Sequence, residues 1–202
     1  LLVLPEVRNP GNWLGGKLPL LDKDGHVLMF MAKAIPHAVV NTDVVKESDL
    51  TSFADLLKPQ WKGKIVFSDP TISGASPNLL ASMVKIFGKE RALQMIRQLV
   101  SQEPVITRDQ RLLLEWVARA KYPIGLGQSN ALYSDFRRAD TPMRLVNFKE
   151  PRFISGGPSN IVVFSQNPNP KATQLYVNWL LTPEGSAIWS RMWTCPTMSR
   201  TW

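Results

Sequence analysis

The feature that most constrains this fold is a strand-like run followed by a loop of small residues and a helical segment. Ile65–Phe67 has the β-branched and aromatic character of a buried strand, and Asp69-Pro70 after it is a turn signal. Pro77 can open a helix, because its missing N–H would have no partner in a first helical turn. The apolar segment 79–87 continues that helix, so the pattern predicts strand, loop and helix in this order.

The small residues of this loop form the first candidate binding site. Ser73, Gly74, Ala75 and Ser76 lie just before Pro77, where the free N–H groups and the positive end of the helix dipole favour an anion. The alternative is an ordinary helix cap, which any strand–helix unit needs. The loop is not a P-loop, because Gly-Lys-Ser/Thr is absent, and its single glycine does not make a dinucleotide fingerprint.

The same alternation of strands and helices continues along the chain and predicts an α/β fold with mainly parallel strand pairing. Ligands of such sheets bind beyond the carboxyl ends of the strands. A second polar strand end follows the strand expected at 122–126, and it comprises Gln128, Ser129 and Asn130. Arg108, just before a helix, is a candidate for a charge-assisted bond to an anion or else a solvated side chain.

Composition excludes several classes of protein. The 202 residues are 44% hydrophobic and 20% charged, as in a folded domain. No apolar run approaches the roughly 20 residues of a membrane span. The net charge is +8, but no stripe of basic residues with interleaved aromatic residues is present, and Arg137-Arg138 is the only adjacent basic pair. We therefore expect no nucleic-acid partner.

Metal binding and catalysis are also disfavoured. Cys195 is the only cysteine, which excludes an intrachain disulfide and a cysteine-based metal site. His26 and His37 lie in one segment, without an acidic neighbour or a third histidine at ligand spacing, so we expect no metal and no cofactor. No Ser–His–carboxylate set is visible, and Asp69 beside Ser68 is explained by the turn, so we expect a protein that is not an enzyme.

Several blocks between residues 38 and 190 carry a family resemblance. The two most specific blocks are Asp55-Leu56-Leu57-Lys58-Pro59-Gln60-Trp61-Lys62-Gly63-Lys64 and Asn178-Trp179-Leu180-Leu181-Thr182-Pro183-Glu184-Gly185. With them, the chain resembles the extracellular solute-binding proteins of bacterial ABC importers, in the type 2 class that includes ferric-ion-binding proteins.

The resemblance implies a two-lobed α/β fold of the type 2 periplasmic-binding-protein class with lobe one incomplete. The expected divisions are 1–48 (a remnant of lobe one and the crossover), 49–150 (lobe two) and 151–202 (the returning lobe-one segment and C-terminal helices). A signal peptide and the first half of lobe one are not in the chain, so the resemblance implies a fragment. Exposed edges at strands 27–31 and 161–164 then predict self-association.

The function implied is reversible capture of a small anionic or polar ligand between two lobes. The implied location is the periplasm, or outside the cell on a membrane tether, and the implied partner is an ABC-transporter permease. Ferric-binding members use an adjacent tyrosine pair, whereas Tyr133 stands alone here. We therefore expect a carboxylate, phosphonate or phosphate ester instead of iron. The alternatives are an enzyme or a ligand-sensing regulatory domain on the same fold class.

Overall fold

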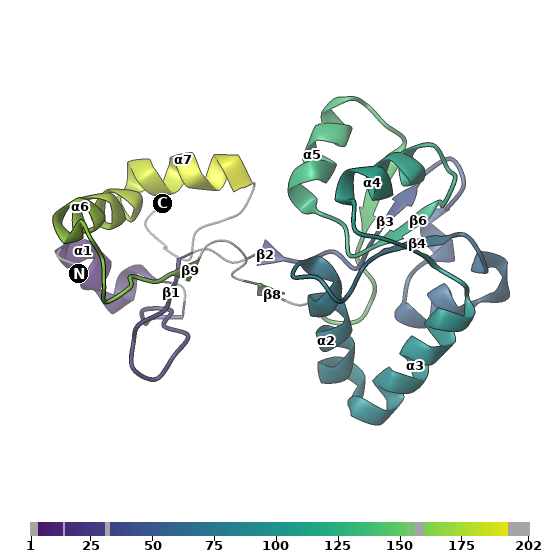
Figure 1. Ribbon diagram of the computed structural model, residues 1–202, viewed down its shortest axis with the longest axis horizontal. Helices are drawn as coiled ribbons and strands as arrows, with labels where there is room; N and C mark the ends of the chain where they lie inside the picture. The colour runs from purple at the N-terminus through teal and green to yellow at the C-terminus, as the bar shows by residue number, and fades with distance from the viewer. Residues whose placement is uncertain (1–3, 14, 31–32, 153, 156–159, 194–202) are drawn as a thin grey trace. The chain divides into compact units, whose positions relative to one another are not determined.

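The computed structural model describes residues 4–13, 15–30, 33–152, 154–155 and 160–193 (Figure 1). The chain divides into two compact units, which are described separately. Unit 1 comprises residues 1–34 and 154–202, and unit 2 comprises residues 35–153. Within the described ranges, no helix has the length and apolar character needed to cross a membrane.

A five-stranded sheet forms the centre of unit 2, in the order β5-β4-β6-β3-β7. The strands are β3 (Ala38–Asn41), β4 (Ile65–Ser68), β5 (Val105–Thr107), β6 (Ile124–Leu126) and β7 (Met143–Val146). β4 pairs in parallel with β5 and β6, whereas β3 is antiparallel to both β6 and β7.

The expectation of mainly parallel pairing is therefore wrong for β3. The chain passes into unit 2 along β3 and leaves along β7, and the register Ala38↔Val146 brings these two strands together at one end of the sheet. Because the chain enters and leaves unit 2 at the same end of these two neighbouring strands, β3 and β7 run antiparallel. The structure consequently places residues 35–48 in unit 2, so its first boundary lies earlier than the expected division at residue 48.

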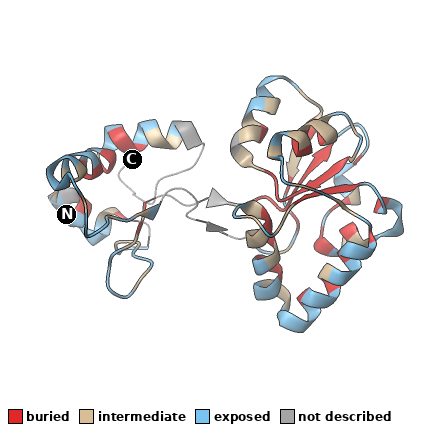
Figure 2. Cartoon of the chain, viewed as in Figure 1, coloured by how far each residue is buried: buried red, intermediate tan, exposed pale blue. Residues whose placement is uncertain are grey.

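Helices cover both faces of this sheet (Figure 1). The helices α2 (Ala75–Phe87) and α3 (Lys89–Ser101) lie on one face, and α4 (Gln110–Ala118) and α5 (Asn130–Arg138) lie on the other. Strand alternation divides the core between the faces: Ile65 and Phe67 pack with α2 and α3, whereas Val66 packs with Leu113 of α4. Figure 2 shows the buried residues concentrated in these strands.

Unit 1 has less regular structure. It contains α1 (Pro5–Arg8), two short antiparallel strand pairs and the helices α6 (Pro170–Leu180) and α7 (Pro183–Trp193). The strand pairs are β1 (Leu28–Met29) with β9 (Asn160–Ile161) and β2 (Lys33–Ala34) with β8 (Ile154–Ser155). Its buried cluster comprises Val7, Trp13, Leu28, Phe30, Val177, Leu180 and Leu181.

Two expected elements differ in extent. The helix expected near Pro77 begins at Ala75, because Gly74 provides the cap position. The strand expected over 161–164 ends at Ile161, and Phe164 is 79% exposed. An apolar run without a second partner strand does not extend the ladder. Cys195 lies outside the described residues.

Candidate functional site

The first turn of α2 carries a set of free backbone donors. No hydrogen bond within the described residues uses the N–H groups of Ser73, Gly74, Ala75 or Ser76. Gly74 has φ 152° and ψ −153°, a conformation that essentially only glycine adopts. A β-carbon at Gly74 would meet open space, so backbone conformation and not crowding requires glycine here. These donors, together with the helix dipole, suit an anion.

The two predicted polar loops lie against each other. Gly127 follows β6 with φ 72°, and a β-carbon there would collide with Ser76 Oγ in the first turn of α2. Ser129 then caps α5, because its Oγ accepts the N–H of Leu132 at 3.4 Å. The structure therefore brings residues 73–76 and 127–130 to one edge of the sheet, as expected for the carboxyl ends of the neighbouring parallel strands β4 and β6.

Gln110, a residue that the sequence analysis did not single out, joins this edge. Its Nε2 donates to Ser68 Oγ at the end of β4 and to the Gly127 carbonyl at 3.2 Å. Its Oε1 accepts the N–H of Ser129 at 2.8 Å. One side chain thus fixes the end of β4 and the loop before α5. Its position in the sequence could have indicated this role, because Gln110 is the first residue of α4, directly after the cap Asp109 and close to the end of β5.

Three buried polar atoms at this edge have no hydrogen-bond partner in the structure: Ser76 Oγ, Gln128 Oε1 and Asn130 Oδ1. Ser76 is 1% exposed and Gln128 is 2% exposed. An unsatisfied buried polar group costs about 1–3 kcal/mol, so such groups require an explanation. All three belong to the residues that the sequence analysis proposed as ligand contacts.

Arg108 lies at the same edge but is already paired. Its Nε donates to Asp69 Oδ2 at 2.7 Å, and the arginine side chain is 74% exposed. The other carboxylate oxygen of Asp69 accepts the hydroxyl and the backbone N–H of Thr71. The bonds from Thr71 and Arg108 lower the pKa of Asp69 to about 2. Arg108 therefore offsets the charge of Asp69 near the free N–H groups, and its expected contact with a ligand stays a prediction.

Tyr133, the tyrosine that stands alone in the sequence without an adjacent second tyrosine, belongs to the core of unit 2. It is 6% exposed, and its hydroxyl donates to the Met143 carbonyl at 3.3 Å. Its phenol oxygen is therefore engaged within unit 2.

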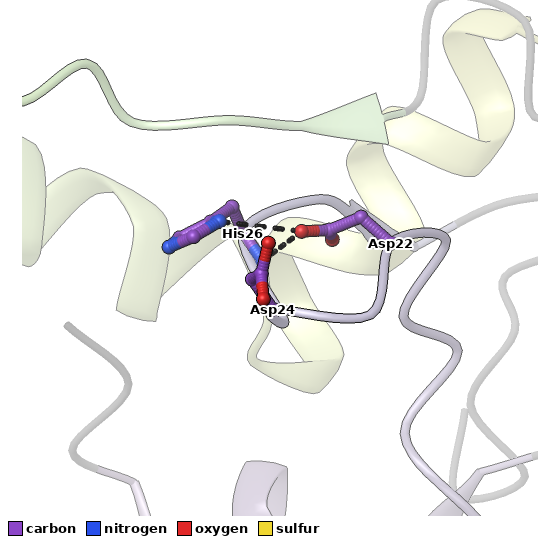
Figure 3. Close-up of side chains that lie close together, drawn as sticks. All are labelled: Asp22, Asp24 and His26. Carbon is purple, nitrogen blue, oxygen red and sulfur yellow. Dashed lines mark hydrogen bonds and ion pairs between the residues drawn. The ribbon is translucent and has the colours of Figure 1, made fainter.

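A separate cluster in unit 1 overturns one expectation. Asp22, Asp24 and His26 bring potential ligand atoms within 4.8 Å of one another (Figure 3), so the statement that His26 has no acidic neighbour at ligand spacing is wrong. The spacing of these residues in the sequence did not reveal the cluster, because it forms only when a tight turn brings the three side chains together. However, the Asp22 carboxylate already accepts the backbone N–H groups of His26 and Val27 at 2.9 and 2.7 Å. These bonds lower the pKa of Asp22 and explain why its carboxylate lies inside the turn.

Solved structures share this fold. Iron-bound HitA from Pseudomonas aeruginosa has a TM-score of 0.78 and 20% identity, over 100% of this chain and 64% of that chain. The ferric binding protein from Campylobacter jejuni has a TM-score of 0.76 and 16% identity, over 99% and 65%. The periplasmic binding protein AfuA from Actinobacillus pleuropneumoniae, with exogenous fructose-6-phosphate bound, has a TM-score of 0.71 and 19% identity, over 98% and 60%.

A relative from Haemophilus influenzae, described as an uncharacterized protein, is 24% identical over 168 residues. The match covers 81% of this chain and 48% of that relative. The chain thus spans about half the length of this relative and under two thirds of the solved structures above. These neighbours confirm the expected periplasmic-binding-protein fold. The family whose model matches this chain consists of binding proteins and not enzymes.

The model of one family, the bacterial extracellular solute-binding proteins, matches residues 11–199, which is nearly the whole sequence. The resemblance on which the sequence analysis relied is thereby confirmed. The chain belongs to the bacterial extracellular solute-binding protein family.

Proposed function

We propose that this chain is part of the solute-binding component of an ABC importer and that unit 2 binds a small anionic organic ligand. The ligand class is a carboxylate, a phosphonate or a phosphate ester. The protein would act in the periplasm, or outside the cell on a membrane tether, and would deliver its ligand to a membrane permease. The family match and the solved relatives support this role.

One observation carries the proposal of an anion. Within the described residues, the N–H groups of residues 73–76 at the start of α2 have no hydrogen-bond partner, and the Ser76 hydroxyl in the same turn is buried and unpaired. A helix N-terminus alone contributes about 0.3–1 kcal/mol when exposed, so hydrogen bonds must supply most of the affinity. The Asp69 carboxylate at this edge is paired with Arg108, which weakens its repulsion of an anion.

We propose that the ligand is this small organic anion and not ferric iron. Two of the solved relatives are described as iron-bound or ferric-binding, and a third contains fructose-6-phosphate. In this chain no two tyrosines are adjacent in sequence, and the Tyr133 hydroxyl is bonded within the core. Phenolate oxygens are the ligands that would suit ferric iron here, whereas amides and hydroxyls are weak substitutes. Visible absorption from a tyrosinate–iron complex after addition of ferric salt would contradict this preference.

A pair of glycine variants tests the anion site. Gly74→Ala strains the backbone that presents the donors, whereas Gly88→Ala strains an equally open position, with φ 79°, at the other end of α2. Binding of phosphate and small carboxylates is measured by calorimetry for both variants and for the unchanged chain. We expect at least about a tenfold loss of affinity for Gly74→Ala, because several charge-assisted bonds weaken together, and no loss for Gly88→Ala. Equal affinities in all three proteins would refute the site.

A further inference from the structure

The ring of His37 joins the two segments by which the chain enters and leaves unit 2. Unit 2 comprises residues 35–153, so His37 lies near its first boundary and Phe148 lies near its last. The backbone N–H of His37 donates to the Val146 carbonyl at 3.0 Å, and its Nδ1 accepts the Phe148 N–H at 3.0 Å. The ring also stacks on the Phe148 ring, with 4.9 Å between the centroids. Beyond the β3–β7 ladder, the two segments are therefore joined by one titratable side chain.

The hydrogen bond at Nδ1 determines where the protons of this ring lie. A ring nitrogen that accepts an N–H carries no proton, so the single proton of neutral His37 is on Nε2. A second proton can only bind at Nδ1, where it would face the Phe148 N–H, a donor against a donor. Protonation of the ring must therefore break the bond to Phe148, and acid acts on one defined contact.

The charged groups closest to the ring lie on the outgoing segment. His37 is 2% exposed, and burial is the main cause that lowers its pKa below the ordinary value of 6.5. Arg152 also lowers this pKa, whereas the Pro151 backbone and the Glu150 carboxylate raise it. The side chain of Lys149 belongs to an exposed residue. Within the described residues, Oε2 of Glu150 is buried and has no hydrogen-bond partner, so this carboxylate is available to a charged ring.

The other elements packed near the ring hold their charged groups elsewhere. Phe53 of η3 (Phe53–Leu57) meets the histidine ring edge-on, with 5.0 Å between the centroids. Asp55, the charged residue of η3, already accepts hydrogen bonds from its own loop and pairs with a lysine. Arg144, the charged residue of β7, lies opposite Val40, farther along the ladder. Glu150 is therefore the acceptor that best suits a charged imidazole.

We propose that His37 is an acid-sensitive switch that controls how residues 148–152 are held to the start of β3. In the neutral state, Nδ1 holds the Phe148 N–H. In acid, Nδ1 takes a proton from solvent, the bond to Phe148 breaks, and the charged ring pairs with the Glu150 carboxylate. The proton returns to solvent when the pH rises, so the change is reversible. This inference does not depend on the ligand proposed above.

Nuclear magnetic resonance of the full chain between pH 8 and pH 5 tests the switch. Amide protection, the exchange rate relative to that of an unstructured chain at the same pH, is measured together with the titration of the His37 ring. We expect the Nε2–H tautomer at pH 8, a ring midpoint below pH 6.5, and at least about a tenfold loss of protection at Phe148 as the ring becomes charged. The Asn41 N–H, which donates to the Pro123 carbonyl at the other end of β3, should keep its protection.

Four results would overturn the inference. The first two are an Nδ1–H tautomer at pH 8 and a ring that stays neutral throughout the interval. The third is a ring that titrates while the Phe148 amide keeps its protection. The fourth is an equal loss of protection at Phe148 and Asn41, which would show general unfolding instead of a local change.

Two variants and a control assign the roles of the two side chains. His37→Gln retains an acceptor without a titrating group, so Phe148 should stay protected over the whole interval. Glu150→Gln removes the negative charge that favours the protonated ring, so the midpoint of His37 should fall by about 0.5 pH or more. Glu90→Gln, at an exposed position of α3, is the matched control and should leave the midpoint unchanged. An unchanged midpoint in Glu150→Gln would contradict the pairing with Glu150, and a loss of Phe148 protection in acid in His37→Gln would exclude His37 as the switch.

Discussion

Unit 2 and unit 1 bury their apolar side chains in different ways. In unit 2, alternate residues of each central strand enter two separate clusters, and each cluster is covered by helices. In unit 1 one small cluster is buried, while Leu175, Tyr176 and Trp179 of α6 are 75%, 50% and 38% exposed. A sheet with helices on both faces hides both faces, whereas a helix pair with short strands hides one stripe. The comparison predicts different responses to substitution in the two units.

The largest expected effect is the loss of a core side chain in unit 2. Leu113 is fully buried between α4 and the sheet, so Leu113→Ala leaves a cavity and should cost about 2–5 kcal/mol of unfolding free energy. Leu175→Ala in unit 1 should change the unfolding free energy by less than about 0.5 kcal/mol, because the side chain is exposed. Urea unfolding followed by circular dichroism measures both values. Similar costs for the two variants would show that unit 1 is packed as tightly as unit 2.

The next effect concerns the loop that Gln110 holds. Gln110→Leu leaves the Ser129 N–H and the Gly127 carbonyl without their partner, at a cost of about 1–3 kcal/mol. We expect the Ser129 amide to exchange with solvent at least about tenfold faster, which NMR hydrogen exchange detects. Gln94→Leu on the exposed face of α3 is the control and should leave that amide unchanged. Unchanged exchange in Gln110→Leu would mean that the loop holds its conformation without this residue.

A further difference between the units is the response to acid. His37 of unit 2 is 2% exposed, stacks on Phe148 and accepts the Phe148 N–H at its Nδ1. Burial lowers the pKa of His37 below its ordinary value of 6.5. The folded state therefore favours the neutral ring, and its contribution to stability is present above pH 6.5 and is lost as the pH falls below that value.

Thermal unfolding between pH 7 and pH 5 tests this expectation. His37→Gln keeps an acceptor for the Phe148 N–H without a titrating group, so its stability should depend less on pH over this interval. The same pH dependence in His37→Gln as in the unchanged chain would exclude His37 as its source.

The smallest expected effect is weak self-association through unit 1. The exposed apolar residues of α6, with Phe164, favour contact between copies at high concentration. Light scattering should show a mass above 22.7 kDa at micromolar concentration, and Leu175→Asp should shift the mass towards the monomer. Val100→Asp, at a 64% exposed position of unit 2, is the matched control and should not change the mass. A monomer mass for the unchanged chain would contradict the prediction.

The elements were largely predictable because their signals are local. The run Ile65–Phe67 and the cap at Asp109 identify β4 and the start of α4 from residues that are neighbours in sequence. The two polar loops were predictable for a related reason, since parallel strands of one sheet end at the same edge. Such predictions need only the period of side chains and the direction of strands.

The sequence by itself thus determined the α/β class, the position of the 73–76 and 127–130 loops, and the family blocks. Only the tertiary structure decided that β3 runs antiparallel, that Gln110 joins Ser68 to a loop that follows another strand, and that Asp22, Asp24 and His26 meet in one turn. It also decided which amides remain unpaired. The physical reason is that propensity and capping act over a few residues, whereas the partner of a buried polar group is chosen by segments that meet only when the chain has folded.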